Sequence, residues 1–455
     1  MTTTMQPPRS ATRPRIAIVG GGPGGLLTAW HLERQATRPA HVTLFEASGR
    51  LGGKVLTPSF ATAPVRYEAG AAELYDYTPV GEDPLRELVA SLGLPTVPLG
   101  GATVVTPDGP VANLDDLGAV LGPAARRDLE AFDREARGAM TRREFYAADQ
   151  AAADAADTFA TMLAGCGEPA ARRYVETMIH SDLATEPGLT NVGYGLQNYL
   201  MNDPAYMRLY AIAGGNERLI EAVVAGLHAA IRLHTPVLRI DATPGGRFRV
   251  ITAGSPSGKE LFDAVVLALP LQHLARIDSD DDTLAAAVTT HCERFDHPAH
   301  YLRVTALFDE PFWRGRIDGG YLMLDAFDGC CLYDESAREP EPRHGVLGWL
   351  LAGTAAAAWA GRDDDAIAAA ALESLPHWLG DARRHLREAR VHRWIGAVSG
   401  LPGGWRPPAI DRRHQPAPTT HPHLFVVGDY LFDSTLNGVL DSAQHVAGWL
   451  ATEFG

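Results

Sequence analysis

The sequence has 455 residues, of which 46% are hydrophobic and 21% are charged, and its formal net charge is −15. This length supports roughly three average domains, or two large ones, with ample cores. The negative charge disfavours nucleic acid and anionic membranes as partners, and no apolar run reaches the ~18 residues that a membrane-spanning helix needs.

The four cysteines form no spaced disulfide framework, which favours a reducing, cytoplasmic location. Residues 1–12 are rich in Thr, Pro and Arg and predict a flexible tail. The spacing of the histidines near His291 fits no standard zinc pattern, so we expect no metal. A homodimer is compatible with the sequence.

Strand-like and helix-like segments alternate at the start of the chain, as in α/β proteins. We expect a strand at Ile16–Val19, a helix at Gly24–Gln35 and a strand at Val42–Phe45. Residues 78–210 read as mainly helical. Later we expect strands at Ile231–Ile240, Phe248–Ala253, Ala264–Leu269 and Tyr301–Phe308, a helix at Thr354–Leu375, a loop at Leu401–Pro422, a strand at Leu424–Val427 and a helix at Gly438–Leu450.

Nucleotide-type segments therefore lie at the start, middle and end of the chain. This order predicts an α/β fold with a Rossmann-type domain assembled from three segments, at residues 13–77, 212–275 and 391–455. The intervening residues 78–211 and 276–390 would form an inserted α+β lobe.

A glycine fingerprint carries the first functional signal. Gly20, Gly22 and Gly25 match G-x-G-x-x-G between the first strand and the first helix. The pattern allows a tight turn, close approach of a pyrophosphate to the backbone, and close helix–strand packing. Glu46 follows the second strand, where a carboxylate can accept hydrogen bonds from a ribose diol and would repel the 2′-phosphate of NADP.

A second glycine pair and two cations follow Glu46 and Ala47. Arg50 and Lys54 could neutralise a diphosphate, and Gly53 could let the backbone approach it. Here the chain resembles the flavin-containing amine oxidase superfamily, which includes monoamine oxidases, polyamine oxidases and L-amino-acid oxidases. Lys54 stands where that family usually has arginine, which keeps the charge but loses the bidentate fork.

The resemblance implies FAD as cofactor and extends to the C-terminus. A strand beginning at Tyr67 would pass beside the flavin, and Asn437 would open a helix whose N-terminus faces the pyrimidine ring. The implied cofactor-binding residues are Gly20, Gly22, Gly24, Gly25, Glu46, Ala47, Arg50, Gly53, Lys54, Gly70, Ala71, Val237, Leu238, Gly428, Asp429, Gly438 and Val439.

Two departures from the family concern the flavin environment. With Trp394 aligned to the family tryptophan, Gly403 falls where monoamine oxidases carry the cysteine that bonds to the flavin. No cysteine lies nearby, so FAD should be non-covalent. The two tyrosines that usually flank the substrate are replaced by Gly404, or by Trp405 if the loop shifts by one residue, and by Val439.

Two further departures concern charge, and they supply the other candidate catalytic residues beside Trp405. Arg303 stands where the family usually has a lysine near flavin N5; it cannot act as a base but could anchor a carbonyl or anionic group, or simply face solvent. Glu73 stands where L-amino-acid oxidases carry the arginine that binds the substrate carboxylate. It would attract an amine or guanidine cation, unless it lies at a surface turn.

These features predict an FAD-dependent amine oxidase that acts on a small-molecule amine. A hydride would pass from the carbon next to the nitrogen to flavin N5, and dioxygen would reoxidise the flavin to give hydrogen peroxide. Three alternatives remain open. They are an L-amino-acid oxidase for an aromatic amino acid, a C–C desaturase or isomerase of the phytoene desaturase and protoporphyrinogen oxidase branch, and a non-enzymatic FAD-binding module.

Overall fold

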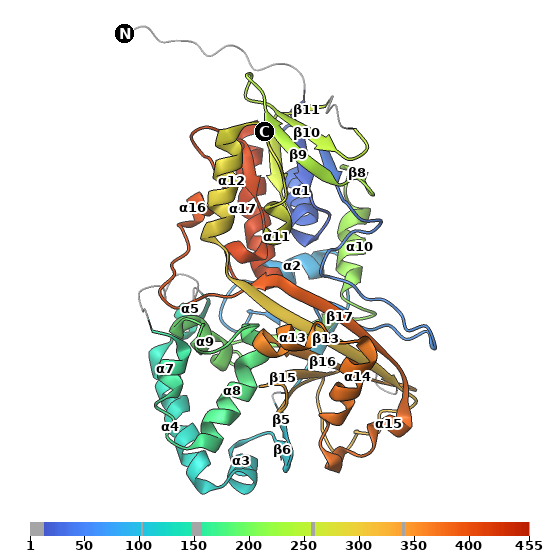
Figure 1. Cartoon of the computed structure of the whole chain (residues 1–455), viewed down its shortest axis with the longest axis vertical. Coiled ribbons are helices and arrows are strands. Elements are labelled where there is room, and N and C mark those ends of the chain that lie inside the picture. The colour runs from blue at the N-terminus through green and yellow to red at the C-terminus, as the bar shows by residue number, and fades with distance from the viewer. Residues whose placement is uncertain (1–12, 102, 147–156, 256–259, 339–341, 455) are drawn as a thin grey trace.

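The computed structural model describes residues 13–101, 103–146, 157–255, 260–338 and 342–454. The expected tail at residues 1–12 lies outside them. The chain forms an upper lobe, which contains both the first strand and the last helix, and a lower lobe built from the middle of the chain (Figure 1).

The upper lobe is organised by a five-stranded sheet whose paired strands are all parallel, in the order β18-β12-β1-β2-β8. Its strands come from the start, the middle and the end of the chain, which confirms the three-segment Rossmann-type assembly. They are β1 (Arg15–Val19), β2 (His41–Phe45), β8 (Ala230–Arg232), β12 (Ala264–Leu267) and β18 (Leu424–Val426).

Both faces of this sheet are covered, so its central strands are continuously apolar. On one face, Ile16 and Ile18 of β1 share a core with helices α1 (Pro23–Gln35) and α17 (Leu436–Phe454). On the other face, Ala17 and Val19 pack against a small antiparallel sheet and helix α12 (Asp282–Arg294). That sheet has the order β11-β10-β9, with β9 at Val237–Ala242, β10 at Phe248–Thr252 and β11 at Leu261–Phe262.

Local signals explain why the surrounding helices begin where they do. Pro23 occupies the first turn of α1, where its missing N–H costs nothing. Helix α2 (Pro84–Ser91) is capped by the Asp83 carboxylate, which accepts hydrogen bonds from two backbone N–H groups. The other helices of the upper lobe are α10 (Glu217–Ala225), α11 (Leu271–Leu274), α16 (Ile410–Arg413) and the 3-10 turn η3 (Asp429–Leu431).

The lower lobe contains a seven-stranded sheet in the order β17-β13-β16-β15-β14-β5-β6. The long strand β13 pairs antiparallel with both β16 and β17. The strands are β5 (Thr103–Thr106), β6 (Gly109–Val111), β13 (Pro298–Phe308), β14 (Tyr321–Leu324), β15 (Cys330–Asp334), β16 (Gly345–Ala352) and β17 (Leu386–Ser399). A three-stranded sheet of order β3-β7-β4 has β3 at Leu74–Asp76, β4 at Thr96–Leu99 and β7 at Arg208–Ile212.

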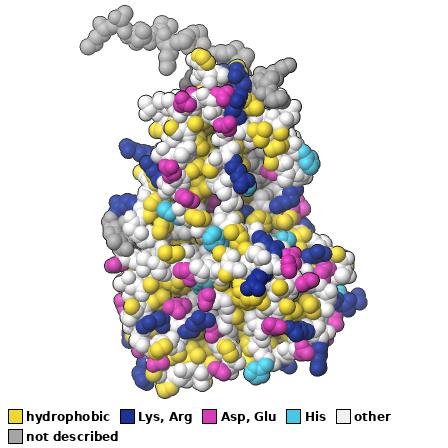
Figure 2. Space-filling model, in the orientation of Figure 1, with side chains coloured by type: hydrophobic (Ala, Val, Ile, Leu, Met, Phe, Trp, Pro, Cys, Tyr) yellow, Lys and Arg dark blue, Asp and Glu magenta, His cyan; other side chains and the backbone are white. Residues whose placement is uncertain are grey.

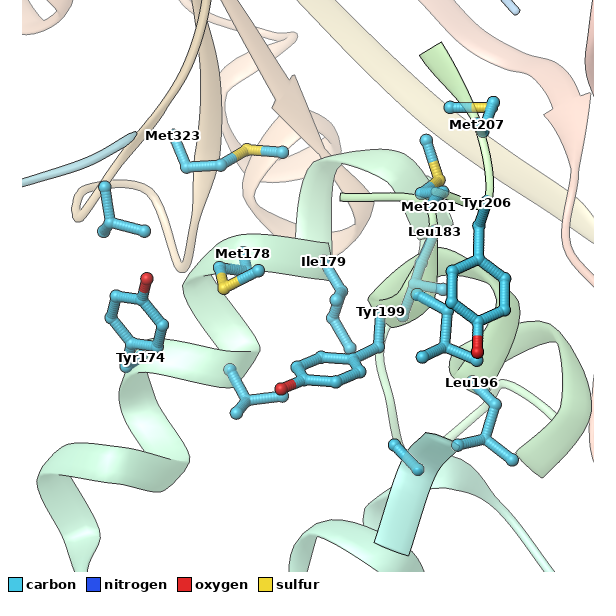
Figure 3. Close-up of a cluster of buried hydrophobic side chains, with 14 of the residues drawn as sticks. Tyr174, Met178, Ile179, Leu183, Leu196, Tyr199, Met201, Tyr206, Met207 and Met323 are labelled. Carbon is cyan, nitrogen blue, oxygen red and sulfur yellow. The ribbon is translucent and has the colours of Figure 1, made fainter. Parts of the chain in front are cut away.

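Helices pack beside these sheets. Side chains of α8 (Pro169–Leu183) and α9 (Val192–Leu200), including Ile179 and Tyr199, fill a shared apolar core (Figure 3). The remaining helices are α3 (Leu114–Val120), α4 (Pro123–Ala139), α5 (Arg142–Tyr146), α7 (Phe159–Leu163), α13 (Gly353–Trp359), α14 (Asp364–Glu373), α15 (Ala382–His385), η1 (Glu335–Arg338) and η2 (His377–Leu379).

Several expected elements differ in the structure. The strand expected at Ile231–Ile240 is two strands, β8 and β9, because His234 adopts a positive φ and Pro236 follows. The helix expected at Thr354–Leu375 is two helices. The strand expected from Tyr67 begins only at Leu74.

Strands β4 to β7 interrupt the stretch expected to be helical, and no sequence pattern predicts β17. The boundary expected at residue 391 falls inside β17, which pairs with β13 in the lower lobe.

The surface shows no field of one charge on the face in Figure 2, where acidic and basic side chains intermingle over both lobes. Among the helices of the described residues, none is long and apolar enough to cross a membrane.

Candidate active site

The glycine fingerprint forms the turn between β1 and α1. Gly20 has a φ of +112°, and a Cβ there would lie 2.2 Å from the carbonyl oxygen of Ala268. At Gly22, by contrast, a Cβ would meet no described atom closer than the Cα of Gly53, at 3.9 Å. Gly22 precedes α1 without a side-chain cap. The start of this helix therefore presents N–H groups to open space, as an anion requires.

Glu46 lies beside this turn at the end of β2. One carboxylate oxygen accepts a hydrogen bond from the Gly21 N–H at 2.8 Å, and the other accepts bonds from the N–H and hydroxyl of Ser48. The next cation, Arg50, donates to the carbonyl oxygens of Leu51 and Gly53. These bonds fix the loop after β2 around the acid.

Lys54 and Asp429 join the first and last segments of the upper lobe. The Lys54 Nζ donates to Oδ2 of Asp429 at 2.6 Å and to the carbonyl oxygen of Ala397 at 2.5 Å. Asp429 is buried and begins the 3-10 turn η3, three residues after the end of β18.

These groups line a long cleft of about 610 Å³, which we call the cofactor cleft. Most of the residues expected to bind the cofactor line it. They are Gly20, Gly22, Gly24, Glu46, Ala47, Arg50, Gly53, Lys54, Val237, Leu238, Gly428, Asp429 and Val439. Gly25 and Gly438 line neither this cleft nor the cavity beside it. Gly25 lies against the backbone, since a Cβ there would be 2.0 Å from the Gly20 carbonyl oxygen.

A second cavity of about 160 Å³, the inner cavity, adjoins the cofactor cleft. The two share the lining residues Pro23, Lys54, Trp394, Asp429 and Val439. Gly70 and Ala71 line the inner cavity only. Its remaining walls carry two carboxylates and three tyrosines, namely Glu73, Asp182, Tyr75, Tyr194 and Tyr301, together with Leu350.

Of the two carboxyl groups, Asp182 is buried and Glu73 is half-buried. Burial raises the pKa of Asp182 to about 7, a hydrogen bond from Tyr321 opposes this rise, and the nearby Glu73 adds to it. Burial also raises the pKa of the Glu73 carboxyl. The Tyr333 hydroxyl and the charge of Arg303 oppose that shift, although the Tyr333 hydroxyl forms no hydrogen bond within normal range. Glu73 is therefore a cavity residue and does not lie at a surface turn.

Arg303 is fully buried, which excludes the solvent-facing interpretation. Its Nη2 forms an ion pair with Glu335 at 2.6 Å, and its guanidinium carbon lies 4.7 Å from the centre of the Tyr333 ring. It does not line the inner cavity or the cofactor cleft. The structure thus places Arg303 behind the cavity wall, next to Glu73 rather than in front of it.

Trp405 lies outside the inner cavity. Its indole N–H donates to the carbonyl oxygen of Arg294, and its ring packs edge-on against Phe295 and His297. The aromatic walls are supplied by Tyr75, Tyr194 and Tyr301 from β3, α9 and β13 instead. The sequence alone leaves open whether Tyr194 lines a pocket or packs a core, and no sequence motif marks the other two.

Trp394 is a further residue of the site, and it was not among the site residues predicted from the sequence. Its indole N–H donates to the carbonyl oxygen of Ala69 at 2.7 Å, and the ring lines both the cleft and the cavity. This bond ties β17 to the segment before Gly70, so that both walls of the cavity are fixed to each other.

Comparison with known proteins decides the family. A model of the flavin containing amine oxidoreductases matches residues 23–449. The chain belongs to this family. AofH of Mycobacterium tuberculosis, assigned as a flavin-containing monoamine oxidase, is 23% identical over 351 residues, which cover 73% of this chain and 72% of AofH.

Solved structures show the same fold. Putrescine oxidase bound to putrescine aligns with a TM-score of 0.75 and 17% identity over 97% of this chain and 99% of that one. A protein of Exiguobacterium sp. 255-15, assigned as a protoporphyrinogen oxidase, aligns with a TM-score of 0.74 and 18% identity over 98% and 100%.

This amine oxidoreductase is a flavoprotein with FAD as its cofactor. The residues present fit FAD. The cleft has open space at the N-terminus of α1, which has no side-chain cap, and the Glu46 carboxylate lies beside it at the end of β2. None of the four cysteines lines the cofactor cleft or the inner cavity, and all four are free thiols, as non-covalent binding requires. Among the described residues, no group of three or more His, Cys, Asp or Glu side chains is arranged to hold a metal.

Proposed function

We propose that the protein oxidises a small amine at the carbon next to its nitrogen. Bound FAD would supply the redox chemistry, as the acceptor of a hydride from that carbon and the donor of two electrons to dioxygen, which would yield hydrogen peroxide. The polypeptide holds the cofactor, orients the amine and excludes water from the reacting carbon.

The observation that carries this proposal is the inner cavity, which adjoins the cofactor cleft and has Glu73 in its wall. A carboxylate there favours a cationic amine or guanidine and disfavours an α-carboxylate. Tyrosine rings line the same space and favour a cation at their faces. The volume of about 160 Å³ supports a small substrate, because drug-sized ligands occupy pockets of roughly 300–1,000 Å³.

Different residues around the cleft would bind different parts of the cofactor. The start of α1 at Gly22 would receive the pyrophosphate, and Glu46 would accept hydrogen bonds from the ribose diol. Val237 and Leu238 would lie against the adenine. Asp429 would accept a hydrogen bond from the ribityl chain, with Lys54 completing the charge balance.

The position of Arg303 weakens the case for an α-amino-acid oxidase. Its ion pair with Glu335 and its absence from the cavity wall leave it without access to a substrate carboxylate. Oxidation of a C–C bond remains the second candidate, because the Exiguobacterium structure shares the fold across the whole chain. The small inner cavity favours an amine over a tetrapyrrole.

The proposal is tested by peroxide production with a panel of amines, in wild-type protein and in Glu73→Gln. We expect the variant to keep its FAD and to lose roughly 1–3 kcal/mol of transition-state stabilisation, because a charged group in the cavity wall loses its interaction with the substrate. An unaffected Glu73→Gln enzyme would remove Glu73 from the site.

A further inference from the structure

A third cavity, which we call the outer cavity, lies in the upper lobe and has no part in the proposed reaction. Its volume is about 720 Å³, which exceeds that of the cofactor cleft and that of the inner cavity. It lies between helices α11 and α12, the end of strand β17 and the turn η3. Drug-sized organic molecules occupy pockets of roughly 300–1,000 Å³, so the outer cavity has room for one such molecule.

The outer cavity adjoins both spaces of the candidate active site. Val398 and Ser399 line the outer and the inner cavity, and Asp429 lines these two cavities and the cofactor cleft. The outer cavity and the cleft also share Pro270, Gln272, Arg276, Ile277 and Ala397. A cofactor that takes electrons from a substrate in the inner cavity must have its reactive part where that cavity meets the cleft. Since Asp429 stands at this junction, the outer cavity reaches the same junction from a further side.

The mouth of the outer cavity is open to solvent. Helix α12 runs along the surface of the upper lobe (Figure 1), and its residues Thr289 and Glu293, which line the cavity, are exposed. Asp296, which follows this helix, is also exposed and lines the same space. A molecule can therefore enter the outer cavity from solvent while a substrate occupies the inner cavity.

The floor of the outer cavity is apolar and uncharged. The buried side chains of Val288, Val398 and Tyr430 line it. The Tyr430 hydroxyl is hydrogen-bonded to Nε2 of His291 at 3.3 Å, so this polar group already has a partner. A floor of this kind favours the rings of an organic molecule over a small hydrated ion.

Charge at the rim favours a cation. The exposed acids Asp278, Glu293 and Asp296 line the cavity, and none of them forms an ion pair within the described part of the chain. Asp429 also lines it, but its carboxylate is already paired with a lysine. Among the described lining residues the one cation is Arg276, so the rim carries an excess of negative charge. It therefore attracts an organic cation and repels an organic anion.

The place of this cavity suggests what its ligand does. Oxidation of a substrate in the inner cavity leaves two electrons and a proton on FAD, whichever bond is oxidised, and these must leave before the next turnover. We propose that the outer cavity binds an organic cation that accepts these electrons, as an alternative to dioxygen. The conjugated rings of such an acceptor would lie on the apolar floor, and the acidic rim would hold its charge. Substrate and acceptor then occupy different cavities and do not compete.

The transfer needs no further reactant. The acceptor A⁺ takes a hydride equivalent, which is two electrons and one proton, from the reduced flavin anion FADH⁻. It leaves as neutral AH, and the cofactor returns to FAD. Because AH has no positive charge, the acidic rim attracts it less than A⁺, which favours its release.

Methylene blue, a planar cationic acceptor, is the probe. The holoenzyme is reduced anaerobically by light and EDTA, and its reoxidation by methylene blue or by dioxygen is followed by stopped flow. In Thr289→Trp, whose indole ring fills part of the outer cavity, the second-order rate constant with methylene blue should fall by at least about fivefold, and that with dioxygen should stay within about twofold. Unchanged reoxidation by methylene blue, or an equal loss with dioxygen, would overturn the proposal.

The matched control is Thr290→Trp. Thr290 is the next residue of α12, is also exposed and does not line the outer cavity. The same substitution there should leave both rate constants unchanged. FAD content shows whether each variant is folded, and Ala285→Phe, which narrows the same cavity, replaces Thr289→Trp if that variant is not.

Binding is measured separately, by equilibrium dialysis of methylene blue against the oxidised holoenzyme. One dye per chain should bind, and its affinity should fall about three- to tenfold in the double variant Glu293→Gln/Asp296→Asn, with a smaller loss at high salt because the rim charges are exposed. No saturable binding, or an affinity that this variant and Thr289→Trp leave unchanged, would also overturn the proposal. Neither measurement uses an amine, so failure of the outer cavity as an acceptor site can be told apart from failure of amine oxidation.

Discussion

The Nζ of Lys54 lies 2.6 Å from Oδ2 of Asp429, although the two residues are 375 positions apart in the chain. Both residues line the cofactor cleft and the inner cavity, so the ion pair lies where the two spaces adjoin. Because the pair faces the space of the cofactor, it should matter for cofactor retention.

Replacement of Asp429 with alanine should weaken FAD binding by roughly 10- to 150-fold, which corresponds to about 1.5–3 kcal/mol for a hydrogen bond to a charged group. The affinity is measured by fluorescence as the apoprotein is titrated with FAD. Asp280→Asn, which removes an exposed carboxylate of the same lobe, serves as the control and should bind FAD normally. Unchanged affinity in Asp429→Ala would mean that the residue does not touch the cofactor.

Substitutions of two glycines of the fingerprint should have different effects. Gly22→Ala adds a methyl group to open space, so the apoprotein should lose no more than about 1 kcal/mol of stability, while FAD affinity falls at least tenfold because the methyl group occupies the space of the pyrophosphate. Gly25→Ala places its Cβ 2.0 Å from the Gly20 carbonyl oxygen and should cost the fold about 3 kcal/mol. Denaturant unfolding of both apoproteins, with FAD titrations, checks this contrast; equal behaviour would contradict it.

Much of the cofactor cleft could be predicted from the sequence because it is built from contiguous motifs. The turn at Gly20–Gly25 and the acid at Glu46 belong to one strand–helix–strand unit, whose geometry follows from local rules. The carboxylate Asp182 could not be placed in this way. Its neighbours come from separate elements. The packing of α8 against β14 brings Tyr321 to it, and the segment before β3 and strand β13 contribute Glu73 and Tyr301 to the same cavity.

The environment of Arg303 could not be predicted from the sequence either. Residue type and strand position suggest either a substrate anchor or a solvent-facing side chain, whereas the structure buries it against Glu335. A buried ion pair depends on a partner 32 positions away, and nothing in the local sequence identifies that partner. The prediction for Trp405 similarly depends on loop alignment, which cannot fix the direction of a side chain in a proline-rich segment.

Binding of a cationic amine should depend on pH through the two carboxyls of the inner cavity. Burial raises the pKa of Asp182 to about 7 and also raises the pKa of Glu73, so the negative charge of the cavity wall falls as the pH drops from 8 to 6. An alkylammonium ion keeps its charge across this range, since such groups titrate near pH 10. Its affinity should therefore fall by up to about tenfold between pH 8 and pH 6 in the wild type, and should change less in Asp182→Asn. Calorimetric titration at both pH values measures this. The same change in affinity in the two proteins would exclude a role for Asp182.

The pair of His180 and Glu186 should stabilise the end of α8, where Asp182 lies. The His180 Nε2 is 3.1 Å from the Glu186 carboxylate, and this bond lowers the pKa of Glu186 to about 2. The pKa of His180 is raised, because its bonds to Glu186 and Gly329 outweigh burial, which lowers it. The Glu186 contribution is present above its unfolded pKa and is lost as pH falls toward 2. The His180 contribution is present below its unfolded pKa, near 6.5, and is lost as pH rises through the higher folded value.

The pair should therefore stabilise the protein most near pH 5.5. There Glu186→Gln should lower the free energy of unfolding by about 1–2 kcal/mol, less than the 3–5 kcal/mol of a fully buried pair, because Glu186 is partly solvated. The loss should shrink at pH 8.5. Denaturant unfolding at the two pH values, with the exposed Glu221→Gln as control, measures the difference. A loss that is independent of pH would show that His180 does not titrate with the pair.

This flavoprotein should oxidise a C–N bond of an amine that carries no α-carboxylate. The most direct measurement is anaerobic bleaching of the flavin in the wild-type holoenzyme, followed in parallel with panels of amines and of α-amino acids. An amine should reduce the flavin faster than any α-amino acid, and readmitted dioxygen should restore the oxidised spectrum with one equivalent of hydrogen peroxide. Faster reduction by an α-amino acid, or no reduction by any amine, would contradict it.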